Sequence, residues 1–177
     1  APARPFVPGF EVSGTVERIG KSVSEFSEGQ RITGLTDFAG YAEYAVCKGS
    51  LIRPLIDSLT FEEGASIPVN WLTAYHCLYF TGPLDKGYKV LVHAAAGGVG
   101  IAAIQMLKKA GCSVIGLAGT EEKIEYLRNY GVDCVINYRR ENFSKRIIDK
   151  FGLKSIDIVL DSYGGKSFKK EWKLLKP

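Results

Sequence analysis

The sequence is poor in methionine: Met106 is the only one among 177 residues, and the chain begins at Ala1. From the missing initiator residue we expect that the chain was processed or cut from something longer. Its first residues also lack the apolar segment that signal peptides contain. One hydropathic stretch, 90–107, includes three glycines together with His93 and Gln105, so it is interpreted as a strand, a turn and a helix. We therefore expect no transmembrane segment.

Cysteine and histidine are too sparse and too widely spaced for a zinc cluster. The four cysteines, at positions 47, 77, 112 and 134, lie at least 22 residues apart, and there are two histidines. Zinc sites built from cysteine pairs need short spacings such as C-x2-C, and none occurs here. We expect buried, reduced thiols, which suit a cytoplasmic protein, and no metal site.

The sequence also lacks a strong excess of either charge, because 23 Lys and Arg against 19 Asp and Glu leave a net charge of only +4. No run of five or six like charges occurs, so the sequence contains no basic segment of the kind that binds nucleic acid or an anionic membrane. With 46% hydrophobic and 24% charged residues, the composition is that of an ordinary globular protein with a sizeable core.

The first sixty residues consist of short apolar runs between glycines, a pattern typical of β-strands and turns. The expected strands span 12–19, 31–35, 41–47 and 51–55. Thr60 followed by Glu63 is a capping-box pattern that opens a helical segment. This segment continues as a second helix over 70–80, which is apolar or aromatic on nearly every face and is expected to be well buried.

After Gly87 the chain repeats a strand-then-helix unit. Strands are predicted over 89–93, 113–118, 133–137 and 156–161, and helices over 100–110, 121–130, 142–151 and 166–175. Thr120 is the predicted N-cap of the second of these helices, and glycines end the first three. Near-continuous Val and Ile strands that alternate with helices predict a doubly wound α/β fold, in which helices cover both faces of a parallel sheet.

A glycine-rich turn joins the first of these strands to the first helix, with the sequence Ala-Ala-Ala-Gly-Gly-Val-Gly over 94–100. Gly97 and Gly100 occupy the second and third glycine positions of the G-x-G-x-x-G motif, and Ala95 stands at the first. In a dinucleotide-binding turn, the backbone must approach a pyrophosphate and helix-terminal N–H groups must point at it. The strand-turn-helix context favours this interpretation. A tight turn without a ligand is the alternative.

The end of the second strand predicts which dinucleotide is bound. An acidic side chain there would accept a hydrogen bond from a free ribose 2′-OH, but this chain has the small, neutral Gly119. Thr120 can donate a hydroxyl hydrogen bond and Lys123 can offer an ammonium group to a 2′-phosphate, so NADP(H) is favoured. Glu121 and Glu122 leave two alternatives open: they stabilise the first turn of the helix, or one of them turns inward.

Several motifs, taken in order, resemble the medium-chain dehydrogenase/reductase superfamily, specifically its zinc-free quinone oxidoreductase branch and, within that, the VAT-1-like proteins. The segment 7–20, V-P-G-F-E-x-x-G-x-V-x-x-x-G, is similar to the signature of the GroES-like catalytic domain. The segment 29–32 resembles the G-D-R-V turn of that domain, and 94–100 resembles the nucleotide fingerprint of the branch. The segment 69–75, V-N-W-L-T-A-Y, is similar to the VAT-1-type linker helix.

The resemblance implies a domain organisation and a cofactor site. A partial GroES-like β-barrel is expected over 1–59, linker helices over 60–86, and a partial NADP-binding Rossmann domain with four strands over 87–177. The implied cofactor residues are Thr73 near the nicotinamide, Gly97, Gly98, Val99 and Gly100 on the pyrophosphate, and Gly119, Thr120, Lys123 and Tyr138 around the 2′-phosphate. A partly buried aromatic residue at the rim is the alternative role for Tyr138.

The resemblance further implies that NADPH delivers hydride to a quinone or an α,β-unsaturated carbonyl without zinc. Phe10 and Val69 stand where zinc alcohol dehydrogenases carry a His and a Cys, and neither side chain can ligate zinc. His76 and His93 are predicted to be packed or hydrogen-bonded rather than catalytic. No proton donor can be named, because the family's substrate-side tyrosine and asparagine lie upstream of this chain. The alternative is an NADP-binding regulatory or partner-binding protein without turnover, and the intact parent is expected to be a homodimer.

Overall fold

The computed structural model describes residues 4–177 and divides into two compact units, one up to Leu72 and the other Thr73–Pro177. The division falls within helix α2 (Pro68–Tyr79). The three segments expected from the sequence, 1–59, 60–86 and 87–177, stay a prediction about domain organisation. Among the described residues, no helix is long and apolar enough to cross a membrane.

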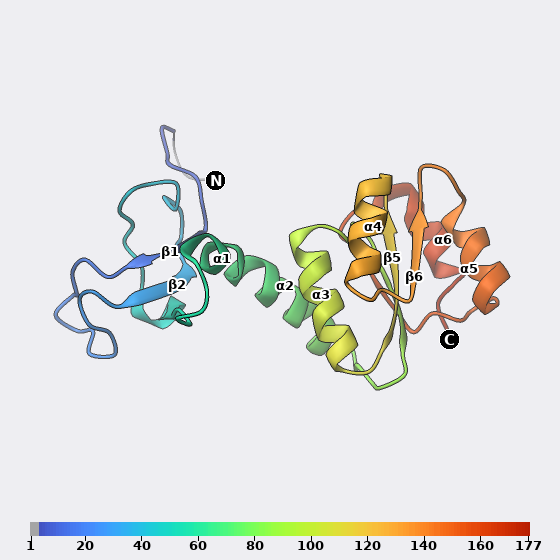
Figure 1. The fold of residues 1–177 in the computed structure, drawn as a ribbon, viewed down its shortest axis with the longest axis horizontal. Coiled ribbons are helices and arrows are strands. Elements are labelled where there is room, and N and C mark those ends of the chain that lie inside the picture. Colours follow the sequence, from blue (N-terminus) through green and yellow to red (C-terminus); the bar gives the residue numbers. More distant parts are fainter. Residues whose placement is uncertain (1–3) are drawn as a thin grey trace. The chain divides into compact units, whose positions relative to one another are not determined.

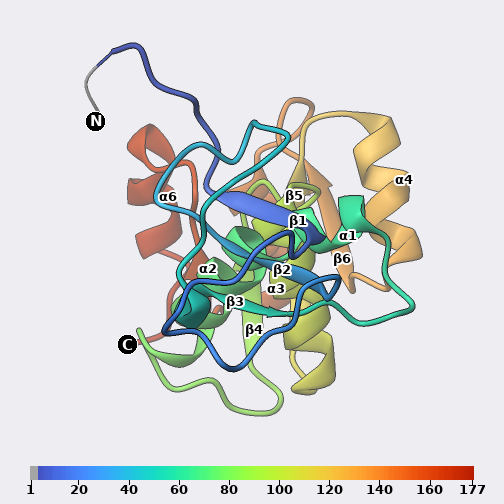
Figure 2. The same cartoon turned by 90° about the vertical axis from the view of Figure 1, so that its left-hand side faces the viewer.

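The N-terminal unit contains a three-stranded antiparallel sheet in the order β1-β2-β3, whose strands are labelled in Figure 2. The strands are β1 (Glu11–Thr15), β2 (Arg31–Leu35) and β3 (Ile52–Pro54), and a short 3-10 turn, η1 (Gly49–Leu51), precedes β3. The prediction for β2 is confirmed, and β1 ends earlier than expected. The strand predicted over 41–47 is wrong: this segment forms bends, and Tyr41, Tyr44 and Val46 are exposed. An alternating pattern makes a strand only where a neighbouring strand can accept its hydrogen bonds.

The capping box predicted before the first helix is confirmed. The backbone N–H of Glu63 donates to Thr60 Oγ1 over 3.2 Å, and the backbone N–H of Thr60 donates to Glu63 Oε2 over 2.9 Å. This reciprocal pair starts α1 (Phe61–Ser66). The expectation of a well-buried helix over 70–80 is wrong, because only Pro68, Ala74 and Leu78 of α2 are buried.

The C-terminal unit is a doubly wound α/β sheet, which confirms the predicted fold class. Its four strands are all parallel and lie in the order β6-β5-β4-β7. They are β4 (Lys89–Val92), β5 (Ser113–Ala118), β6 (Cys134–Asn137) and β7 (Ile158–Leu160). Figure 1 shows α3 (Gly98–Lys109) and α4 (Glu121–Asn129) on one face of this sheet, and α5 (Phe143–Phe151) and α6 (Phe168–Trp172) on the other.

The core on this face is built from alternating strand residues, the inner face of α5, and Ile156 and Leu174 from the connecting segments. It includes Leu91, Ile115, Leu117, Ile136, Phe143, Ile147, Ile156 and Leu174, all buried. The last helix is shorter than the 166–175 predicted, because Gly164 and Gly165 adopt positive φ and a 3-10 turn, η2 (Gly165–Ser167), precedes it. In this helix Phe168 and Trp172 are exposed, whereas Glu171 is buried.

Candidate cofactor site

The glycine loop lies between the carboxyl end of β4 and the start of α3, where the sequence predicted a pyrophosphate site. Gly97 is the N-cap of α3 and offers no side-chain cap, and the first turn carries no acidic residue. Gly97 and Gly98 are exposed, so the first N–H groups of α3 are accessible to an anion. This arrangement fits the phosphates of a dinucleotide.

Gly100 is required by close packing rather than by conformational freedom. A Cβ atom at this position would lie 2.5 Å from the carbonyl oxygen of Ala95 and 2.6 Å from that of Ala94. The loop therefore packs directly against the start of the helix, which is the role of the third glycine in the dinucleotide fingerprint. Ala94 adopts a φ of 45°, a left-handed conformation that costs a residue with a Cβ about 1 kcal/mol.

Tyr138 lies over Gly119, so the structure brings together two residues that the sequence predicted for the 2′-phosphate. A Cβ at Gly119 would lie 2.7 Å from Tyr138 Oη and 3.1 Å from Arg139 Nε. The backbone N–H of Tyr138 also donates to the carbonyl of Ala118 at the end of β5. Arg139 was not predicted from the sequence, although a basic residue that follows Asn-Tyr was a usable signal.

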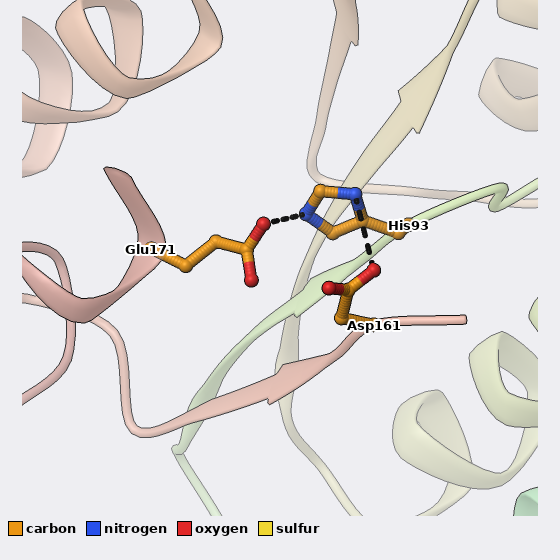
Figure 3. Close-up of side chains that lie close together, drawn as sticks. All are labelled: His93, Asp161 and Glu171. Carbon is orange, nitrogen blue, oxygen red and sulfur yellow. Dashed lines mark ion pairs between the residues drawn. The ribbon is translucent and has the colours of Figure 1, made fainter. Parts of the chain in front are cut away.

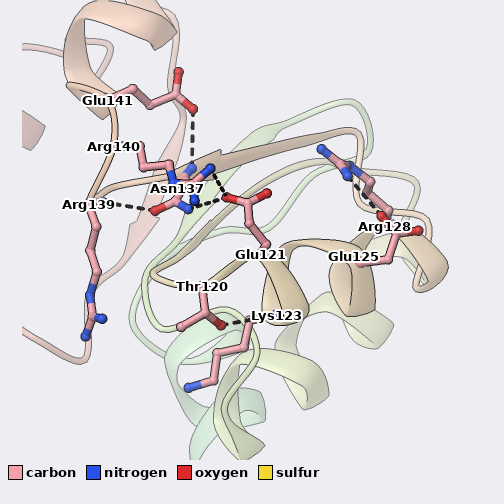
Figure 4. A network of polar contacts seen from close by, with 9 residues as sticks. All are labelled: Thr120, Glu121, Lys123, Glu125, Arg128, Asn137, Arg139, Arg140 and Glu141. Carbon is pink, nitrogen blue, oxygen red and sulfur yellow. Dashed lines mark hydrogen bonds and ion pairs between the residues drawn. The ribbon is translucent and has the colours of Figure 1, made fainter.

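Thr120 and Lys123 form the first turn of α4, beside this pair. The backbone N–H of Lys123 donates to Thr120 Oγ1 over 3.4 Å, which confirms Thr120 as the N-cap. The hydroxyl hydrogen of Thr120 stays available to a ligand, because a hydroxyl can accept one hydrogen bond and donate another. Figure 4 shows the side chains of Lys123 and Arg139 extending from neighbouring segments.

Glu121 reaches the end of β6 from the first turn of α4, while its side chain stays 56% exposed, so both alternatives left by the sequence stay open. Its Oε1 accepts a hydrogen bond of 2.7 Å from Asn137 Nδ2 and lies 3.3 Å from Arg140 Nη1 (Figure 4). The carboxylate is therefore hydrogen-bonded and paired with a cation. A paired acid repels a nearby phosphate less than an unpaired one.

The remaining predicted residue, Thr73, is exposed near the middle of α2, and its place near the nicotinamide stays a prediction. Of the two histidines, His76 stacks on Phe80 with the ring centroids 5.4 Å apart, and His93 is buried with its ring edge-on to Phe143. All four cysteines are free thiols, of which Cys112 and Cys134 are buried.

The residues at the positions of the family's catalytic zinc ligands do not fit a zinc ion. Phe10 packs its ring against Phe38 with the centroids 4.8 Å apart. Val69 presents an aliphatic side chain, and its backbone N–H donates to Glu11 Oε2 over 2.7 Å. Neither side chain offers a nitrogen, oxygen or sulfur ligand.

Two family models match most of the chain. The model described as the alcohol dehydrogenase GroES-like domain matches residues 1–57, and the one described as zinc-binding dehydrogenase matches residues 98–177. Together with the parallel sheet and the glycine loop, these matches define the class. The chain belongs to the medium-chain dehydrogenase/reductase superfamily.

Within the superfamily, the chain is similar to quinone oxidoreductases. It is 37% identical over 175 residues to the quinone oxidoreductase of Homo sapiens, a match that covers 98% of this chain and 53% of that protein. The structure of the Escherichia coli quinone oxidoreductase complexed with NADPH matches with a TM-score of 0.92 and 30% identity, over 99% of this chain and 54% of that one.

The chain is also 36% identical over 176 residues to a synaptic vesicle membrane protein VAT-1 homolog of Danio rerio, a match that covers 99% of this chain and 36% of that protein. The chain spans about half the length of the quinone oxidoreductases it matches.

Proposed function

We propose that this chain is part of an NADPH-dependent oxidoreductase that reduces quinones or α,β-unsaturated carbonyls by hydride transfer without a catalytic zinc. The observation that carries the proposal is the surroundings of Gly119 at the end of β5. Tyr138 and Arg139 lie against Gly119, a position without an acid, Lys123 follows in the first turn of α4, and the nearby Glu121 is paired with Arg140. Such a site favours a 2′-phosphate over a free 2′-hydroxyl.

The chain's own residues bind and orient the cofactor. The N–H groups of Gly98, Val99 and Gly100, after the N-cap Gly97, are assigned to the pyrophosphate because they begin α3. Thr120 and Tyr138 are assigned hydroxyl hydrogen bonds to the 2′-phosphate, to which Lys123 offers its ammonium. Thr73 is assigned to the nicotinamide side. NADPH, when bound, supplies the hydride.

The assay that tests this function measures NADPH consumption against a panel of quinones and enones, using the intact parent as well as this chain. We expect oxidation of NADPH that depends on the acceptor, with NADH a poorer donor. Failure of every acceptor with the intact parent would contradict the reductase. Turnover with equal efficiency from NADH and NADPH would contradict the assignment of the 2′-phosphate site.

An NADP-binding protein without turnover is the second candidate, favoured by the V-N-W-L-T-A-Y segment over 69–75 and the similarity to a VAT-1 homolog. The same assay separates the two: tight NADPH binding by the intact parent with no acceptor-dependent oxidation would support this candidate. We further propose a cytoplasmic location and a homodimeric parent, which fractionation and sedimentation analysis would test.

A further inference from the structure

Three ionisable side chains meet at the carboxyl ends of two neighbouring strands in the C-terminal unit. His93 directly follows β4 and Asp161 directly follows β7, and these strands pair in parallel with Val92 opposite Leu160. Glu171 comes from α6 and points back at the imidazole (Figure 3). Three separate elements therefore converge on one point beside the start of the glycine loop.

The two carboxylates approach opposite nitrogens of the imidazole, and a single ion would bind one of these nitrogens. His93 Nε2 lies 3.2 Å from Glu171 Oε1, and His93 Nδ1 lies 3.8 Å from Asp161 Oδ1. One ligand atom from each residue can be chosen so that all three lie within 4.8 Å of one another. Since zinc bonds to nitrogen and carboxylate oxygen are about 2.0–2.2 Å long, ligands roughly 3–3.5 Å apart can share one ion.

The cluster is dry, and two of its polar atoms lack hydrogen bonds. The side chain of His93 is 8% exposed, that of Asp161 13% and that of Glu171 3%. His93 Nε2 and Glu171 Oε1 are both buried without a hydrogen-bond partner, although they face each other. The two atoms are close enough to pair as ions, but neither has the hydrogen bond that a buried polar atom needs.

The third group, Asp161, is fixed by backbone hydrogen bonds: its Oδ1 accepts from the N–H of Tyr163 over 2.8 Å and from that of Gly164 over 2.9 Å. Among the side chains that the structure describes, Asp161 and Glu171 form ion pairs with His93 alone. Two acidic side chains therefore share a single imidazole.

We propose that His93, Asp161 and Glu171 bind one divalent transition-metal cation of the zinc class. One imidazole nitrogen with two carboxylates suits zinc, whereas magnesium and calcium prefer sites made of oxygen alone with more ligands. The ion would join β4, β7 and α6, and so would hold the strand end from which the glycine loop departs. It uses neither Phe10 nor Val69, the family's catalytic zinc positions, and the sequence predicted no metal site.

Titration of the metal-free 177-residue chain with Zn²⁺, followed by isothermal calorimetry, tests the proposal. We expect one ion per chain and a higher Tm, because a ligand that binds only the folded state stabilises it. Mg²⁺ should give neither effect at the same concentration. Co²⁺ distinguishes the ligands: its spectrum should lack the thiolate charge-transfer band that the four free cysteines would produce.

The substitution Glu171→Gln keeps the shape of the side chain and removes one ionic ligand, so Zn²⁺ affinity should fall at least about tenfold. His76→Gln is the matched control, since it removes the only other histidine and should leave the affinity unchanged. Three results would overturn the proposal: no ion bound by the folded wild type, a thiolate band with Co²⁺, or equal affinity in Glu171→Gln and wild type. The first would assign a proton, instead of a metal, to the space between His93 and Glu171.

Discussion

At the scale of single residues, Lys123 offers the simplest test of cofactor choice. Its ammonium group can pair with a dianionic 2′-phosphate that NADH lacks. We expect Lys123→Ala to weaken NADPH binding by about 1–3 kcal/mol, as for a charge-assisted hydrogen bond, and to leave NADH binding unchanged. Fluorescence titration with both cofactors measures this difference.

The matched control is Lys145→Ala, which removes an exposed lysine from the first turn of α5, another helix of the same unit. It changes the net charge by the same amount and should leave both affinities as they are. An equal loss of NADPH affinity in the two variants would mean that Lys123 acts only through the overall charge.

Gly119 and Tyr138 provide a second test at this scale. A methyl group at Gly119 would come within 2.7 Å of Tyr138 Oη, so Gly119→Ala must push the phenol aside. Tyr138 is 47% exposed and can move, so we expect little loss of stability. Loss of one hydrogen bond to the phosphate should weaken NADPH binding by about 1 kcal/mol. Gly14→Ala, where a Cβ meets nothing within 4 Å, serves as the control in the same titration.

Individual residues also show which parts of the candidate sites could be predicted from the sequence and which could not. The position of Tyr138 beside Gly119 agrees with the sequence, because both follow adjacent parallel strands. Glu171 could not be found this way, since an acid that follows two lysines normally faces water. Its burial depends on where α6 begins, and the positive φ of Gly164 and Gly165 decides that. Its partners His93 and Asp161 are 68 residues apart and follow no metal-binding spacing.

At the scale of secondary-structure elements, the capping box of α1 should contribute measurably to the stability of the N-terminal unit. Thr60→Ala leaves the N–H of Glu63 without its acceptor at the helix start. We expect a loss of about 1 kcal/mol in the free energy of unfolding, measured with urea. Thr60→Ser keeps the acceptor and should recover most of that loss; equal destabilisation in both variants would rule out the cap as the cause.

Asp157 links the start of β4 to the C-terminal segment, and its contribution should depend on pH. Burial alone would raise its pKa, but the ammonium group of Lys176 and the backbone N–H of Lys89, at 2.6 and 2.8 Å, outweigh this effect and lower the pKa. A group with a lowered folded pKa stabilises the protein above its unfolded pKa of about 3.9. That contribution is lost as the pH falls through the folded pKa.

Asp157→Asn should therefore destabilise the protein at neutral pH and reduce the loss of stability between about pH 5 and pH 3. Urea unfolding across this range measures both effects. Asp149→Asn, at an exposed position of α5, is the control and should leave the pH profile unchanged. If the free energy of unfolding falls as steeply with decreasing pH in Asp157→Asn as in the wild type, Asp157 does not cause this pH dependence.

The elements that the sequence predicted well are those whose signals are local. The capping box, the N-cap of α4 and the near-continuous Val and Ile strands are recognised from neighbours a few residues away. The strand expected over 41–47 and the buried helix over 70–80 depend on long-range partners instead. Alternation and apolarity show that a segment can be buried, but only packing decides whether it is.

At the scale of the whole molecule, membership of the superfamily explains why a unit with an antiparallel sheet precedes a unit with a parallel α/β sheet. Two residues of the sequence then bear on whether the reaction uses zinc. Phe10 and Val69, both in the N-terminal unit, stand at the positions of the family's catalytic zinc ligands and offer no ligand atom, so the reaction proposed here uses no Lewis acid at that place. We expect NADPH-dependent reduction by the intact parent to continue after treatment with a zinc chelator, at a rate within about twofold of the untreated protein.

The cation inferred at His93 and Glu171 could obscure this test, because a chelator would remove it as well. The measurement is therefore made in the wild type and in Glu171→Gln, each with and without chelator. Zinc-independent chemistry predicts that the chelator has no effect on the Glu171→Gln variant, whatever it does to the stability of the wild type. If the chelator abolishes turnover in Glu171→Gln and added Zn²⁺ restores it, a catalytic zinc is bound elsewhere, and the reaction proposed for this family member has to include it.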